Sequence, residues 1–145
     1  MTAACDLCQL LAAPPAGVVI WSDDRLSVIA VDDAEYPGFT RVVWNAHVKE
    51  MTDLDVTGRS RVMDAVYAVE SAMRAVMAPE KINLASFGNM TPHVHWHVIP
   101  RYLDDAHFPN STFATAARAG APEALAARRA LVPALHAAIV ERLKA

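Results

Sequence analysis

Hydrophobic residues in the first hundred positions of the chain come in short, β-branched runs separated by turn-forming residues. The runs at 18–21 and 26–31 flank a polar Ser-Asp-Asp-Arg segment, which is typical of a β-hairpin. A third run, 40–44, follows a Tyr-Pro-Gly turn signal. Two further runs occupy 81–86 and 93–100. The pattern therefore predicts five short strands joined mainly by turns.

Between the third and fourth predicted strands the hydrophobic spacing becomes helical. Apolar residues recur at three- and four-residue intervals until Pro79, which predicts an amphipathic helix of about five turns. Thr52 and Asp55 resemble a capping box at its start. A second helical stretch covers 122–144, and Pro133 is expected to kink or break it. The fold class expected is α+β: an antiparallel sheet of about five strands, one long central helix and a C-terminal helical segment.

Composition and charge narrow the class of protein. With 145 residues, of which 54% are hydrophobic and 20% charged, the chain is expected to form a single domain over 1–145. A net charge of −3 argues against nucleic acid or an anionic membrane as a partner. No apolar window of about 18 residues and no basic N-terminal segment is present, so neither a membrane span nor a signal peptide is expected. The expected location is cytoplasmic.

Three histidines alternate with apolar residues in the last predicted strand. Because alternate residues of a strand face opposite sides, His93, His95 and His97 are predicted to share one face, with the apolar residues between them packed on the core. Three interpretations follow. The imidazoles could be tolerated on a solvated face, could bind a divalent metal as in three-histidine zinc sites, or could act as nucleophile and acid-base groups near neutral pH.

Residues 93–99 read His-Val-His-Trp-His-Val-Ile. This segment matches, without a gap, the His-φ-His-φ-His-φ-φ motif (φ apolar) of the histidine triad, or HIT, superfamily. The chain therefore resembles that superfamily. The resemblance extends over about 5–109, from a Cys-x-x-Cys start to a closing His-Phe-Pro, and leaves 122–145 as a helical extension. The sequence around the triad is similar to that of bacterial members described as diadenosine-tetraphosphate hydrolase-like. The resemblance implies a HIT-like fold and a homodimer, with the long helix and its neighbouring strand at the interface.

The chemistry that the resemblance implies is that of a hydrolase acting on nucleotides. It would act at the α-phosphorus of a dinucleoside polyphosphate or a nucleoside phosphoramidate, through a nucleotidyl-histidine intermediate and without a cofactor in catalysis. By position, His95 would be the nucleophile, His97 would lie near the phosphate oxygens and the bridging atom, and His93 would orient His95 through its backbone carbonyl. A nucleotidyl transferase and a non-catalytic nucleotide-binding sensor are the alternatives, and the intact His97 favours hydrolysis.

Residues outside the triad are candidates for holding the nucleotide. Backbone amides around 88–90 and asparagine side chains would contact the phosphates. An aspartate after the second strand would receive the ribose hydroxyls, although Asp32 and Asp33 also fit two solvated turn residues. The nucleotide-binding candidates are Asp32, Asn83, Gly88, Asn89 and Met90.

Two departures from the family pattern stand beside the resemblance. Members commonly carry a Gly-His pair at the start of the third strand, where this chain has Gly38 and Phe39. Other members place Ser, Thr or Gln shortly before the triad to aid protonation of the leaving group, where this chain has Met90. One polar contact and the protonation route therefore differ from the family pattern.

A second cluster of residues has metal-ligand character. Cys5 and Cys8 offer two thiolates on one turn, and with His47 and His93 they could form a tetrahedral Cys₂His₂ zinc site, an arrangement with which some HIT members bind zinc. The other interpretation is that the cysteines are small apolar residues near a helix start and that His47 is a polar strand end. A zinc ion here would be structural, bracing the histidine strand and not acting on substrate.

Overall fold

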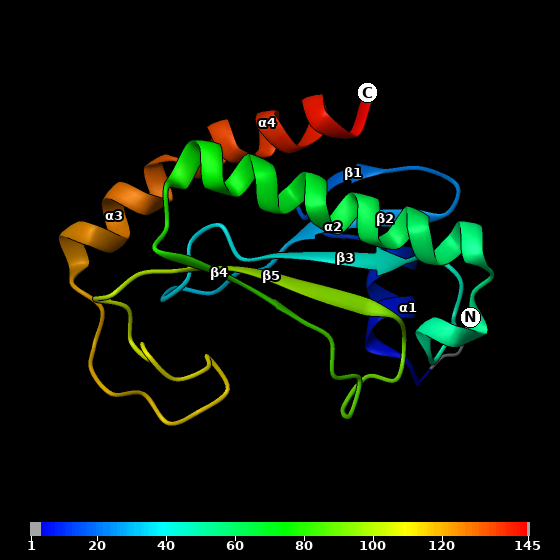
Figure 1. Ribbon diagram of the computed structural model, residues 1–145, viewed down its shortest axis with the longest axis horizontal. Helices are drawn as coiled ribbons and strands as arrows, with labels where there is room; N and C mark the ends of the chain where they lie inside the picture. The colour runs from blue at the N-terminus through cyan, green and yellow to red at the C-terminus, as the bar shows by residue number, and fades with distance from the viewer. Residues whose placement is uncertain (1–3, 145) are drawn as a thin grey trace.

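Five strands form one antiparallel sheet in the computed structural model, which describes residues 4–144 (Figure 1). The strand order is β1-β2-β3-β5-β4, so β5 lies between β3 and β4 inside the sheet. This confirms the predicted five-stranded antiparallel architecture. The strands are β1 (Val19–Ser22), β2 (Leu26–Ala30), β3 (Thr40–Trp44), β4 (Lys81–Ala85) and β5 (His95–Arg101).

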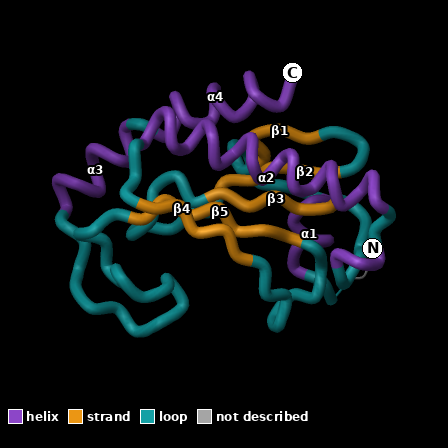
Figure 2. The backbone as a smooth tube through the Cα atoms, viewed as in Figure 1, coloured by secondary structure: helices purple, strands orange, loops and turns teal. Residues whose placement is uncertain are grey.

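The long helix and the C-terminal helix cover one face of this sheet. The helix α2 (Val56–Met77) lies over the sheet roughly along the direction of the strands, and α4 (Val132–Lys144) packs on it, as Figure 2 shows. The helix α3 (Pro122–Ala130) precedes α4, and the short α1 (Asp6–Ala12) lies against the other face. Among residues 4–144, no helix combines the length and the apolarity that a membrane span needs.

Neighbouring residues of a strand enter different parts of the core. Val42 belongs to the cluster between the sheet and the helices α2 and α4, with Val66 and Leu135. Val43, the next residue of β3, packs instead with Cys8 of α1 on the opposite face. This sorting follows from the period of two along a strand, and it leaves the face opposite α2 only partly covered.

The ends of α2 differ in part from the predicted ones. Asp55 caps the helix by accepting a hydrogen bond from the Gly58 amide at 2.7 Å. The capping box joins Glu50 and Asp53 around the 3-10 turn Met51–Asp53, so the predicted box of Thr52 with Asp55 is wrong. Thr52 lies inside that turn and therefore cannot be the residue that precedes a helix.

The C-terminal helical stretch breaks at Leu131, which confirms the break expected near Pro133. Pro133 sits in the first turn of α4, where its missing N–H leaves no helical hydrogen bond unmade. One strand boundary differs from the predicted one. The strand β5 begins at His95, because the His93 amide donates to the Thr91 carbonyl and the Val94 amide to the Val48 carbonyl, outside the ladder with β3. The sequence suggested a helix start near Cys5 and Cys8 but gave no bounds for α1.

Candidate active site

His95 and His97 lie on the face of the sheet that α2 does not cover. Both belong to β5 and are nearly buried, with 7% and 5% of their surfaces exposed. Val94 and Val98 point into the core beneath α2, so the alternation along the segment sets which side chains reach the open face. The two imidazole rings stand edge to face, with their centroids 5.0 Å apart.

The backbone carbonyl of His93 fixes the orientation of the His95 ring. The His95 Nδ1–H donates to this oxygen over 2.6 Å. Since a neutral imidazole carries one N–H, the lone pair is then on Nε2, at the other end of the ring. Burial lowers the pKa of His95, and the charge of Arg41 lowers it further. The geometry therefore presents a neutral imidazole with a free lone pair, which is the nucleophilic form.

Arg41 of β3 lies directly across from His97 in the strand register. Its Nε–H donates to the His97 Nδ1 over 3.4 Å, which leaves the His97 proton on Nε2. Burial, the Arg41 charge and His95 together lower the pKa of His97 to about 4. Sequence reasoning missed Arg41. The available signal was a charged residue within a strand whose neighbours are otherwise β-branched or aromatic.

Aromatic rings surround His97 on its remaining sides. Phe39, which stands where the family pattern has histidine, meets the His97 ring edge to face at 5.5 Å between centroids. Phe113, from the long segment after β5, lies at 5.6 Å, and Phe87, after β4, at 6.5 Å. The departure at Phe39 therefore replaces a polar contact with an apolar wall.

The histidines open into a cavity of about 600 Å³. Its wall includes Arg41, His95 and His97 on one side and the loop after β4 on the other. Gly88, which has a positive φ of 74°, turns the chain within this loop. The volume is that of an ordinary small-ligand site. The residues lining it are Asp6, Leu7, Leu10, Arg41, Phe87, Gly88, Asn89, Met90, Thr91, His95, His97 and Phe113.

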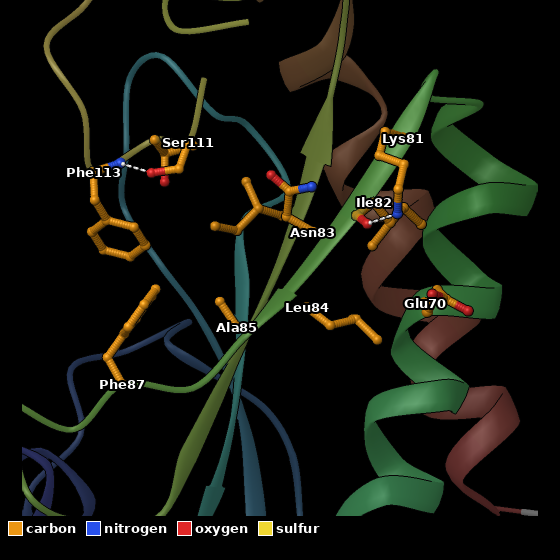
Figure 3. Close-up of a pocket in the computed structure, with 11 residues that line it drawn as sticks. Glu70, Lys81, Ile82, Asn83, Leu84, Ala85, Phe87, Ser111 and Phe113 are labelled. Carbon is orange, nitrogen blue, oxygen red and sulfur yellow. Dashed lines mark hydrogen bonds between the residues drawn. The ribbon is translucent and has the colours of Figure 1, made fainter. Parts of the chain in front are cut away.

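The nucleotide-binding candidates fall in three places. Gly88, Asn89 and Met90 line the histidine cavity. Asn83 lines a neighbouring cavity of about 390 Å³ along β4, where Figure 3 shows it among the labelled residues. Its side-chain oxygen accepts a hydrogen bond from Arg101 at 2.7 Å. Asp32 follows β2, is exposed, and is not among the described residues that line either cavity.

Cys5, Cys8, His47 and His93 come together beside this cavity, as the zinc interpretation requires. Their ligand atoms all lie within 4.8 Å of one another. The His93 Nδ1 is 3.4 Å from the Cys5 Sγ and 3.5 Å from the Cys8 Sγ, and the His47 Nδ1 is 3.4 Å from the Cys8 Sγ. A tetrahedral zinc ion separates sulfur and nitrogen ligands by about 3.6 Å, so the four side chains fit one.

The contact on the far side of the His93 ring supports the same fit. Its Nε2–H donates to the backbone carbonyl of Trp44, which leaves the Nδ1 lone pair directed at the two thiols. A backbone partner of this kind is typical of histidines that ligate metal. His93 thus belongs to this cluster through its side chain, and to the His95 contact through its main chain.

Comparisons with known proteins agree with this geometry. A family profile described as HIT domain matches residues 15–104. Among solved structures, the chain is similar to a histidine triad protein from Bradyrhizobium japonicum, at a TM-score of 0.69 and 23% identity over 86% of this chain and 89% of that one. It is similar to a hypothetical histidine triad nucleotide-binding protein from Sulfolobus tokodaii, at a TM-score of 0.66 and 16% identity over 94% and 93%.

A Zn-bound histidine triad family protein from Mycobacterium smegmatis is a further structural relative, at a TM-score of 0.62 and 20% identity over 95% of this chain and 94% of that one. No curated protein sequence matches the chain. At these identities, the structural likeness shows a common fold.

Proposed function

Because the chain belongs to the HIT domain family, we propose that it hydrolyses nucleotides at the α-phosphorus, with His95 as the nucleophile. The substrate is a dinucleoside polyphosphate or a nucleoside phosphoramidate. The observation that carries the proposal is the 2.6 Å hydrogen bond from the His95 Nδ1 to the His93 carbonyl. This bond leaves the His95 Nε2 lone pair free at a cavity that can hold a nucleotide.

The proposed reaction takes place in two displacements. First, the His95 Nε2 lone pair forms a bond to the α-phosphorus, and the bond from phosphorus to the leaving group breaks. Water then attacks the same phosphorus, the phosphorus–nitrogen bond breaks, and a nucleoside monophosphate is released with one proton passed to solvent. Dividing the reaction in this way replaces one difficult displacement with two easier ones.

The neighbouring groups stabilise charge during these steps. The His97 Nε2–H, set by the Arg41 contact, is a hydrogen-bond donor for an oxygen on the transferred phosphate. The loop through Gly88 and Asn89 lines the same cavity, and its backbone N–H groups would donate to the phosphate. These donors are fixed before the substrate arrives, which is the arrangement that favours the transition state.

A metal hydrolase with all three histidines as ligands is less consistent with the geometry. Of the triad, His93 alone belongs to the cluster of metal-ligand atoms found among residues 4–144. The His95 Nδ1 is engaged by a carbonyl and the His97 Nδ1 by Arg41. A nucleotidyl transferase shares the first displacement with the hydrolase and differs in the acceptor, whereas a sensor would bind nucleotide without forming the intermediate.

We test the proposal by measuring AMP release from diadenosine tetraphosphate and from adenosine 5′-phosphoramidate after exhaustive chelation. The His95→Ala variant should lose about 10⁴-fold or more of the wild-type rate, since it lacks the nucleophile. His136→Ala, which removes a histidine of α4 outside the cavity, is the control and should retain the wild-type rate. Nucleotide binding without AMP release by the wild type would support the sensor instead.

A structural zinc ion at Cys5, Cys8, His47 and His93 is the second part of the proposal. The donor types and their separations fit the ion, and the zinc-bound relative has the same fold. Bound there, zinc would supply no chemistry to the substrate. It would join α1 to the residues that precede β5, and so support the carbonyl that orients His95.

A further inference from the structure

Arg41 is a partly buried cation without a counter-ion among the described residues. It is partly buried in β3 and lines the cavity together with His95 and His97. None of the ion pairs among residues 4–144 includes it. Asp6 of α1 is the one acidic residue among the described residues that line the same cavity, and it makes no ion pair with Arg41. An arginine placed in this way is expected to bind an anion.

A comparison with Arg101 shows how a structural arginine is satisfied in the same protein. Arg101 donates to both carboxylate oxygens of Asp105, to Asn83 and to the Asn110 carbonyl. Arg41 donates only from Nε, to His97, and no hydrogen bond within residues 4–144 occupies its two terminal nitrogens. Its guanidinium also lies 5.9 Å from the centre of the Phe39 ring. The terminal N–H groups of Arg41 are thus available to a ligand in the cavity.

The position of this charge relates it to the leaving group. Arg41 lies directly opposite His97, and the HIT resemblance places His97 near the phosphate oxygens and the bridging atom. The surrounding rings of Phe39 and Phe113 keep the local environment apolar, which strengthens the interaction of the guanidinium with an anion. The low pKa of His97 keeps that imidazole neutral near pH 7, so it holds no extra proton to donate.

We infer that Arg41 is a catalytic residue that stabilises an anionic leaving group, and that the substrate is therefore a phosphoric anhydride and not a phosphoramidate. The inference rests on the proposed function and narrows its two substrate classes to one. The terminal nitrogens of Arg41 would contact the bridging and non-bridging oxygens of the departing polyphosphate.

The two substrate classes differ in what the leaving group requires. When an anhydride reacts, the bond from the His95 Nε2 to phosphorus forms and the phosphorus–oxygen bond breaks. The electron pair stays on the bridging oxygen, whose new negative charge meets Arg41, and no proton is needed. When a phosphoramidate reacts, the phosphorus–nitrogen bond breaks and the departing amine must take up a proton. A fixed cation assists the first reaction and offers nothing to the second.

The experiment compares kcat and KM for diadenosine tetraphosphate and adenosine 5′-phosphoramidate in the wild type and in Arg41→Met. We expect Arg41→Met to lower kcat for the tetraphosphate by about 10²-fold or more, and to change kcat for the phosphoramidate by less than about tenfold. Arg41→Lys should recover part of the tetraphosphate kcat because it restores the charge. Arg61→Met removes an arginine that is paired with Asp23 outside the cavity, and it should leave both rates unchanged.

Four outcomes would overturn the inference. An equal loss of kcat on both substrates in a folded Arg41→Met variant, or a change confined to KM, would contradict a role at the leaving group. A wild type that prefers the phosphoramidate would contradict the substrate class while leaving the proposed function intact. A wild type that releases AMP from neither substrate would overturn both. Near-UV circular dichroism checks folding, and the wild-type preference decides the substrate class even where Arg41→Met does not fold.

Discussion

His97 lies between aromatic rings and next to a permanent cation, and its protonation is accordingly unfavourable. Burial is the largest cause of its low pKa, followed by the charge of Arg41 and the proximity of His95. The neutral ring keeps one N–H and one lone pair, and Arg41 decides which nitrogen holds which. At the residue scale, His97 is therefore a neutral hydrogen-bond donor with a fixed orientation, and it carries no additional proton near neutral pH.

This low pKa predicts how stability depends on pH. Above about pH 6.5, His97 is neutral in both the folded and the unfolded state. Between 6.5 and about 4, only the unfolded state takes up the proton, so the free energy of unfolding falls as the pH falls. The loss from this residue is at most about 1.4 kcal/mol per pH unit, and it levels off below pH 4.

Urea unfolding of the wild type and of His97→Asn across this pH range measures the effect. The difference in the free energy of unfolding between the two proteins should change between pH 6.5 and 4, since the asparagine does not titrate. His93, His95 and His136 also have lowered pKa values, but they are present in both proteins. Parallel curves for the two proteins would contradict the prediction.

The segment between β5 and α3 contains no helix or strand, yet it holds Phe113 beside His97. Asp105 anchors it. This carboxylate accepts two hydrogen bonds from Arg101, and further ones from the backbone amides of Tyr102, His107 and Phe108. The Arg101 contact and these amides keep the pKa of Asp105 well below its usual range despite its burial. At the scale of an element, the buried Arg101–Asp105 ion pair and its hydrogen bonds hold this segment in place, although it has no regular secondary structure.

We predict that Asp105→Asn destabilises the protein by about 3–5 kcal/mol, because it leaves Arg101 as an uncompensated buried charge. The side chains of Arg101 and Asp105 are 3% and 1% exposed. Asp104→Asn is the matched control, since the neighbouring carboxylate is 56% exposed and pairs with Arg128 at the surface. Its cost should be no more than about 1 kcal/mol. Urea unfolding at neutral pH measures both, and equal losses would contradict the role given to Asp105.

The elements with a strict hydrophobic period were predictable from the sequence. The strands and α2 were predicted closely because their apolar positions repeat at two or at three to four residues. The helix α1 has two turns, too few for a period to emerge, and its cysteines carry contacts that depend on His47 and His93, far along the chain. Arg41 was missed for a related reason. Arg41 reaches the site because the strand register places it opposite His97. The register between β3 and β5 cannot be read from the sequence of either strand alone.

The metal cluster joins parts of the molecule that are distant in sequence. Cys5 and Cys8 belong to the start of α1, His47 follows β3, and His93 precedes β5. A bound ion would therefore connect the helix on the open face to two neighbouring strands of the sheet. At the scale of the whole molecule, the apolar contacts of α2 and α4 hold those helices to one face of the sheet. A metal ion at this site would hold α1 to the opposite face in the same way.

Removal of metal is accordingly expected to lower the melting temperature. A ligand that binds only the folded state at 100 times its Kd stabilises it by about 2.7 kcal/mol, which corresponds to about 10 °C in a protein of this size. Chelation should produce a shift of this order in the wild type and none in Cys8→Ser. Elemental analysis should find one zinc ion per chain in the wild type and in the control His136→Ala. An equal metal content in Cys8→Ser would contradict the assignment.

The homodimer stays a prediction. The long helix α2 was expected at its interface, and α4 packs on α2 within the same chain, burying Leu135 and Ile139. Sedimentation equilibrium should give twice the chain mass of 15.7 kDa. A single species at the chain mass would contradict the prediction.

The proposed catalytic groups and the exposed residues that line the same cavity come from different kinds of structure. His95, His97 and Arg41 stand on β5 and β3, each of which is paired to a neighbour on both edges. Phe87, Met90 and Phe113 project from irregular segments and are more than half exposed, and the two phenylalanine rings, labelled in Figure 3, meet edge to face. Substitutions at these three positions can therefore change the lining of the cavity without disturbing the ladder hydrogen bonds that hold His95. In such an architecture, ligand preference can change through the loops while His95, His97 and Arg41 keep their positions in the sheet.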